Sequence, residues 1–134
     1  MALQDAANDP VVLRAPAHLP KAVIRIPVRD QDGHPTSGVR LPDVVVPLGS
    51  HGGQNSPLSG LCSLGSSYVA FAKTKDEREA TSDSRISLAE RYKDRNDYVN
   101  RVRAAARELE QRGLLLTEDA AIITHTAAEV TALK

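Results

Sequence analysis

The chain is poor in cysteine and in aromatic side chains. It contains one cysteine, Cys62, together with three tyrosines, one phenylalanine and no tryptophan. A single cysteine excludes an internal disulfide framework and any metal site built from a cysteine cluster. Because large rings are scarce, the core must be built mainly from valine, leucine, isoleucine and alanine. At 134 residues, the chain amounts to one domain or less.

The chain also lacks an excess of either charge, since 17 basic residues balance 17 acidic ones. Binding to nucleic acid or to a membrane surface needs a basic face, so we expect no nucleic-acid partner and no membrane partner. No stretch reaches the roughly 18 apolar residues of a membrane span. The first residues show neither the basic nor the apolar region of a signal peptide. We therefore expect a soluble, cytoplasmic protein.

Proline and glycine are confined to one part of the chain. All eight prolines lie between Pro10 and Pro57, and seven of the eight glycines lie between Gly33 and Gly65. Because proline removes a backbone donor and fixes φ, the first half cannot be a regular helical bundle. We predict a poorly ordered arm over 1–21 and one domain over 22–134, with an extended and loop half (22–73) and a helical half (74–134).

Two irregular extended segments are predicted in the first half. Residues 22–29 alternate apolar with basic side chains, which is the period of a half-buried strand, and a turn signal follows at 30–33. The most apolar run covers 39–48, where Pro42 and Pro47 favour an irregular strand over a helix. A loose hairpin across 30–38 would join the two segments, and a glycine-rich loop follows over 49–65. Residues 68–71 fit either a strand or a buried linker.

The second half predicts three to four helices, at about 75–80, 88–93, 95–112 and 118–132. Thr74 and Ser87 each open a capping box, because a glutamate follows three residues later. Gly113 is placed to end the long helix, and Thr117 is placed to cap the last one. The long helix has an apolar stripe at helical spacing: Tyr98, Val102, Ala105, Ala106 and Leu109. The fold class predicted is therefore an α/β or α+β fragment.

No catalytic constellation is complete in these residues. The nucleophile elbow of an α/β-hydrolase needs Gly-x-Ser-x-Gly, and no serine of this chain has both glycines. His51-Gly52-Gly53 superficially resembles the oxyanion-hole loops of lipases, but the tripeptide is better interpreted as a structural loop that needs glycine conformations. A general base must reach a nucleophile, and none can be named beside His51. We assign no catalytic residue.

The other histidines suggest no metal site. His18 and His34 lie in proline-rich loops and are expected to be exposed to solvent. His125 precedes Glu129 by four residues in the last helix, and a solvated pair is favoured because no third ligand is suggested. In the long helix, acidic residues precede arginines by four residues, so the two can pair on one face. This indicates a solvated face rather than an RNA-binding patch. We expect no metal and no cofactor.

Several blocks of sequence follow one another in an order and spacing that are typical of one family. The first block is Gly38-Val39-Arg40-Leu41-Pro42-Asp43-Val44-Val45-Val46-Pro47-Leu48, followed by Gly53-x-Asn55. The later blocks cover 65–74, 77–81, 87–92, 98–106 and 113–119. Together they resemble the closing section of large bacterial proteins of the alpha/beta hydrolase domain family. The resemblance covers about Val23 to Asp119.

The resemblance implies an α/β-hydrolase-like fold and esterase-like hydrolase activity in the complete protein. It places the nucleophile and the catalytic histidine in the part that precedes this closing section, so no catalytic residue is carried over. Where the family has an aromatic-rich Tyr-x-Gly-Trp-Asn stretch, this chain has His51-Gly52-Gly53-Gln54-Asn55. The resemblance therefore implies that His51, Gly52, Gly53 and Asn55 border a pocket, in a loop that has lost those aromatic rings.

Two classes of function stay open. In the first, the chain is the C-terminal part of such a hydrolase and is catalytically incompetent alone. Its partner is then the remainder of the hydrolase domain as an upstream chain, or a second copy. In the second, it is a stand-alone helical protein-interaction module whose helices after Thr74 bury their apolar stripes against each other or against a partner. A weaker third option is a small enzyme that uses His51.

Overall fold

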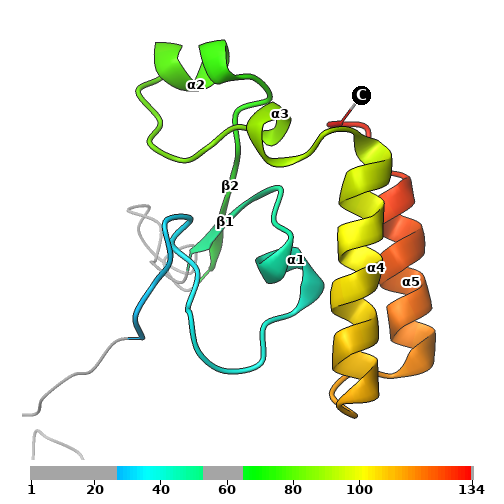
Figure 1. Ribbon diagram of the computed structural model, residues 1–134. Coiled ribbons are helices and arrows are strands. Elements are labelled where there is room, and N and C mark those ends of the chain that lie inside the picture. Colours follow the sequence, from blue (N-terminus) through cyan, green and yellow to red (C-terminus); the bar gives the residue numbers. More distant parts are fainter. Residues whose placement is uncertain (1–26, 53–64, 134) are drawn as a thin grey trace, which may run out of the picture.

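The computed structural model describes residues 27–52 and 65–133. These residues form helices and one two-stranded antiparallel sheet (Figure 1). In chain order the elements are α1 (Pro42–Val45), β1 (Gly49–Gly52), β2 (Ser67–Ala70), α2 (Lys75–Ala80), α3 (Leu88–Arg91), α4 (Arg95–Gln111) and α5 (Thr117–Ala128). The mixed α and β class predicted from the sequence is confirmed. No helix of the described residues is long and apolar enough to cross a bilayer.

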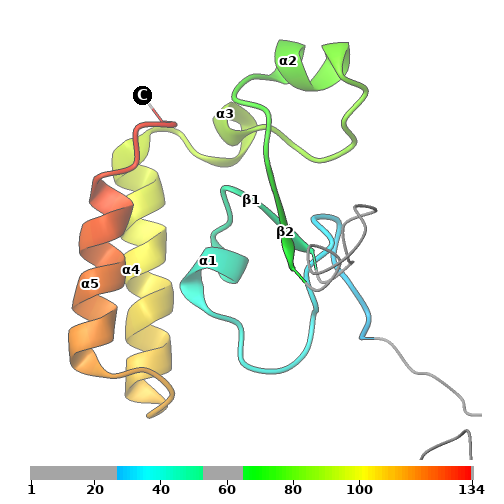
Figure 2. The ribbon, with the colours of Figure 1, turned by 180° about the vertical axis from the view of Figure 1, so that it is seen from behind.

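Helices α4 and α5 form an antiparallel hairpin, and both views show them side by side (Figures 1 and 2). The predicted stripe of α4 is buried, and its buried residues are Tyr98, Val99, Val102, Ala106 and Leu109. Gly113 adopts a positive φ of 68° and ends α4 as predicted. Its N–H donates to the Glu110 carbonyl, and the next N–H donates to the Leu109 carbonyl, which together make a Schellman motif.

Local capping signals place the starts of α2 and α4. The Asp94 carboxylate accepts a hydrogen bond from the Asp97 N–H at 2.8 Å, so α4 begins at the break expected near residue 94. The Thr74 hydroxyl accepts likewise from the Glu77 N–H at 3.2 Å and starts α2. The predicted cap at Thr117 is wrong. Its hydroxyl donates to Glu110 at 2.6 Å instead, and α5 starts without a side-chain cap.

The prediction of an extended segment over 39–48 is wrong for its middle part, which forms the short helix α1. Pro42 stands in the first turn, where its fixed φ suits a helix and its missing N–H costs nothing, and Asp43 adds acid to that turn. The strand β1 begins at Gly49, inside the stretch predicted as loop. A Cβ on Gly49 would lie 2.6 Å from the Val69 carbonyl oxygen, so the glycine permits this close pairing with β2.

The part of the predicted hairpin that the structure describes is also corrected. Arg29 forms an isolated antiparallel bridge with Pro35 across the turn, rather than pairing with residues 39–48. Gly33 adopts a φ of 83°, as the turn signal at 30–33 predicts. Residues 22–26 of the first predicted strand, and the predicted arm over 1–21, lie outside the described residues.

One hydrophobic core joins residues on both sides of position 74. Its buried members are Val46, Phe71, Leu88, Tyr92, Tyr98, Val99, Val102, Ala127 and Leu133. The rings of Tyr92 and Tyr98 meet edge to face, with centroids 5.2 Å apart. The proline-rich segment around α1 therefore packs on the same core as the helical hairpin.

Candidate functional site

Several titratable side chains lie together where the 30–36 turn meets β1 and β2. We call this region the turn–strand site. His51 lies on β1 opposite Tyr68 of β2. The His51 ring has its centroid 5.0 Å from the Tyr68 ring and 5.7 Å from the His34 ring. The turn and the two strands thus bring together two histidines and a tyrosine from segments far apart in sequence.

His34 is fully buried, with an exposed fraction of 0%, so its predicted exposure is wrong. The Asp30 carboxylate accepts hydrogen bonds from the backbone N–H of Asp32 at 3.1 Å and of His34 at 2.9 Å. These bonds fold the turn back on itself and direct His34 inward. The Nε2 atom of His34 then accepts the backbone N–H of His51 at 2.9 Å. Because Nε2 is the acceptor, the neutral ring carries its proton on Nδ1.

Asp30, Asp32 and His34 place carboxylate and imidazole atoms within 4.8 Å of one another, as in a metal centre. Their bonding does not fit one. Asp30 is bound by Arg40 at 2.7 Å, and both oxygens of Asp32 are bound by Arg91. Each carboxylate is therefore already paired with a guanidinium group. Neither nitrogen of the neutral His34 ring has a free lone pair that could bind a metal. The cluster fits a turn closed by ion pairs.

The Arg91–Asp32 pair fastens this turn to the rest of the fold across 59 residues of sequence. The side chains of Arg91 and Asp32 are only 12% and 14% exposed. The Arg91 guanidinium carbon also lies 4.0 Å from the centroid of the buried Phe71 ring, a cation–π contact. The pair therefore fixes the turn against α3 and the core.

Among the described residues, the His51 imidazole lacks the partners of a catalytic base. Its Nε2 lies 3.9 Å from the Asp43 carboxylate, which is too far for a hydrogen bond, and the two side chains are 44% and 61% exposed. Such a solvated pair holds the ring only weakly. Gly52 ends β1 opposite Ser67, inside the stretch predicted as loop. The other two predicted pocket residues, Gly53 and Asn55, lie outside the described residues.

Three serine hydroxyls of the described ranges bind groups other than histidine. The Ser50 hydroxyl accepts from the Arg85 guanidinium at 3.0 Å, and the Ser67 hydroxyl donates to the Gly52 carbonyl at 3.5 Å. The Ser87 hydroxyl donates to the Glu90 carboxylate at 2.7 Å. Within the part of the chain that the structure describes, no serine hydroxyl is hydrogen-bonded to an imidazole, so that part holds no nucleophile–base pair for acyl transfer.

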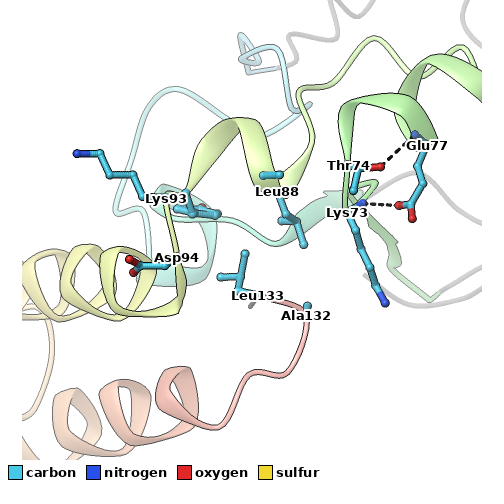
Figure 3. A pocket seen from close by; sticks show the side chains of 10 residues that line it. Lys73, Thr74, Glu77, Leu88, Lys93, Asp94, Ala132 and Leu133 are labelled. Atoms are coloured by element: carbon cyan, nitrogen blue, oxygen red, sulfur yellow. Dashed lines mark hydrogen bonds between the residues drawn. The ribbon is translucent and has the colours of Figure 1, made fainter.

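A hollow of about 320 Å³ lies between α3, the start of α4 and the C-terminal segment (Figure 3). Leu88 and Leu133 face it, while the ammonium groups of Lys73 and Lys93 point away from each other (Figure 3). The Glu77 carboxylate accepts a hydrogen bond from the Lys73 backbone N–H at 2.8 Å. In a binding site a few polar groups are expected to point toward one place, and the polar groups around this hollow do not do so.

A second concavity, an apolar groove of about 480 Å³, runs between α1 and the α4–α5 hairpin. It is lined mainly by side chains that carry no reactive group, among them Leu41, Leu48, Val102, Ile122 and Ile123. Such a groove can hold an apolar surface, and the polar side-chain groups among its lining residues are the Asp43 carboxylate, the Tyr98 phenol and the Thr126 hydroxyl.

Sequence comparison identifies the family. Residues 4–125 match the family described as alpha/beta hydrolase domain, a span that includes every block of the resemblance. No curated protein matches the chain. No solved structure matches it either. Since the family match covers far more than half of the sequence, the chain belongs to the alpha/beta hydrolase domain family.

Proposed function

We propose that this chain is a scaffold-forming part of an esterase-like α/β-hydrolase and is catalytically incompetent by itself. Membership of the alpha/beta hydrolase domain family supports the hydrolase part of the proposal. The observation that carries the second part is the missing nucleophile. The sequence contains no Gly-x-Ser-x-Gly, and the hydroxyls of Ser50, Ser67 and Ser87 bind arginine, a backbone carbonyl and a glutamate instead of histidine.

The turn–strand site would then border the pocket of the complete enzyme. His51 and Gly52 stand at the end of β1, where the ring of His51 is partly open to solvent. Gly53 and Asn55 belong to the same proposal as the next residues of that border. A solvated imidazole to which no nucleophile of the described ranges is bound suits a pocket wall better than a catalytic base.

The exposed strand β2 supports the proposal that the remainder of the hydrolase domain covers this strand and completes the fold. All four residues of β2 are exposed, including Tyr68 at 55% and Val69 at 52%. An isolated two-stranded ribbon is marginally stable, and further strands or a covering element are normally needed. We therefore propose the remainder of the domain as the partner that covers β2. The alternative is that a second copy of the chain covers it.

Hydrolysis of p-nitrophenyl acetate and p-nitrophenyl butyrate by the purified chain tests the proposal. We expect the rate to equal that of buffer plus an equal concentration of a catalytically inert protein. We also expect His51→Ala and Ser50→Ala to leave that rate unchanged. Saturable turnover that either substitution abolishes would show that the chain carries its own active site.

A further inference from the structure

We propose that His34 is a pH-sensitive latch. When its imidazole is neutral it holds β1 against the 30–36 turn, and when the imidazole is protonated it releases β1. The latch consists of one hydrogen bond, from the His51 backbone N–H to the His34 Nε2 at 2.9 Å. This inference concerns how the turn–strand site is held together, and it does not depend on the proposed function.

The chemistry of imidazole makes this bond a switch. A neutral ring has one acceptor nitrogen, and in His34 that nitrogen is occupied by the His51 N–H. A protonated ring has two N–H donors and no acceptor. Protonation therefore turns the attraction at Nε2 into an opposition of two donors, and the His51 N–H loses its partner.

The surroundings of His34 favour the neutral ring. The side chain is fully buried, and its Nδ1 has no hydrogen-bond partner within the described part of the chain. Burial lowers the pKa of His34 more than the negative charge of Asp30 raises it, and the neighbouring His51 and Arg40 lower it further. Asp32 raises the pKa, but its carboxylate is already paired with Arg91.

The groups that face the latch are few, and they come from four segments: the turn, residues 40–43, β1 and β2. Asp30, Asp32 and Arg40 lie around His34, and His51 lies on β1. The Asp43 carboxylate of α1 lies 3.9 Å from Nε2 of His51, and the Tyr68 ring of β2 lies tilted against the His51 ring. Both Asp30 and Asp32 are held by arginines, so neither carboxylate is free to turn and accept a hydrogen bond from a newly protonated ring.

Release of this bond matters because it leaves His51 held by the pairing of β1 with β2, while the preceding residue, Ser50, stays bound by Arg85. Within the described residues β1 pairs with β2 alone, and all four residues of β2 are exposed. His51 is the third residue of the four in β1, next to Gly52 at its end. Protonation of His34 should therefore loosen the end of β1 first, while the helical hairpin stays intact.

Nuclear magnetic resonance on the full ¹⁵N-labelled chain tests the latch between pH 5 and pH 8. The imidazole of His34 is titrated through its ring carbon shifts, and the protection factor of the residue-51 amide is measured over the same range. We expect that protection to fall by about tenfold as His34 becomes protonated, with the same midpoint. The amide of Val102 in α4 should keep its protection and serves as the internal control for folding.

Three variants assign the sensor. His34→Gln supplies an amide oxygen near the position of Nε2 without a titratable proton, so the residue-51 amide should stay protected at every pH. His51→Gln keeps the backbone N–H and removes the other ring, so the transition should persist. His125→Gln, at an exposed histidine of α5, should leave the transition unchanged.

The proposal is overturned if His34→Gln retains the pH transition or if His51→Gln abolishes it. It is equally overturned if His34 titrates in the unmodified chain while the His51 amide stays protected. That last comparison needs no substitution, so it decides the matter even where His34→Gln fails to fold.

Discussion

The Tyr92 hydroxyl donates a hydrogen bond to the Pro47 carbonyl oxygen at 2.8 Å, across 45 residues of sequence. Tyr92 follows α3, and Pro47 lies between α1 and β1; both residues are buried. Burial also raises the pKa of Tyr92, so the phenol stays a neutral donor. This bond joins the proline-rich segment to the helical segment, and it bears directly on whether the two form one structure.

Tyr92→Phe should lower the free energy of unfolding by about 1–2 kcal/mol, because it leaves the buried Pro47 carbonyl without a donor while keeping the ring in place. Urea denaturation followed by circular dichroism measures this change. Tyr68→Phe is the matched control, since that side chain is 55% exposed and should change stability by less than about 0.5 kcal/mol. Equal losses in the two variants would contradict the assigned role of Tyr92.

Arg91→Ala should cost about 2–3 kcal/mol, because it leaves Asp32 nearly buried without its partner and uncovers the Phe71 ring. Arg101→Ala is the matched control. Arg101 pairs with Asp97 on the solvated face of α4 and is 51% exposed, so its loss should cost less than about 1 kcal/mol. A loss at Arg91 no larger than at Arg101 would show that the turn is not fastened through this pair.

Acid should destabilise the fold in a window set by Asp83 and Glu90. Hydrogen bonds from Arg85 lower the pKa of Asp83 to about 2, and hydrogen bonds from Arg78 and Ser87 lower that of Glu90 to about 2. A lowered carboxyl pKa contributes stability above the unfolded value, and that stability is lost as pH falls toward the folded value. We expect urea midpoints to drop between about pH 4.5 and pH 2, and Arg78→Gln to flatten this drop.

His34 should add a separate pH dependence at higher pH. Because burial lowers its pKa, the folded state binds fewer protons than the unfolded chain, so its contribution is complete above the ordinary value of 6.5 and is lost as pH falls below it. Between pH 7 and pH 5.5 the urea midpoint should therefore decline in the unmodified chain and not in His34→Gln. The same decline in both proteins would assign the effect to another group.

Native-state hydrogen exchange should distinguish a docked hydrolase segment from a stand-alone helical module. The Val46 N–H donates to the Pro42 carbonyl at 2.8 Å, and the Phe71 N–H donates to the Leu48 carbonyl at 3.0 Å. Val46 and Phe71 are both core residues, so their amides should be protected comparably with those of α4. Protection confined to residues 75–128 would favour the module instead.

The helical part of the fold could be predicted because its signals are local. Thr74 and Asp94 sit at helix starts, and Gly113 ends α4 where its positive φ is needed. The α1 helix is not predicted, because Pro42 and Pro47 in an apolar run argue for an irregular strand over a helix, although a proline in the first turn also favours a helix. β1 was missed because glycine usually marks a loop, while here Gly49 permits close strand pairing.

The turn–strand site could be predicted only in part. The sequence singled out His51 and Gly52, and the turn signal at 30–33 was visible. The burial of His34 depends on its contact with His51, 17 residues away, and on the pairing of Arg91 with Asp32. No local pattern encodes such contacts. The spacing Asp30-x-Asp32-Gly33-His34 did indicate a tight turn, and that turn is what directs the histidine inward.

Covalent labelling of the folded chain by an alkyl fluorophosphonate tests the central claim most directly. Such reagents attack serines that a neighbouring base has activated, and intact mass spectrometry counts the adducts. The account predicts an unmodified mass for the native chain, equal to that of His51→Ala treated in the same way. A stoichiometric adduct on one serine, lost on unfolding and absent in His51→Ala, would contradict it.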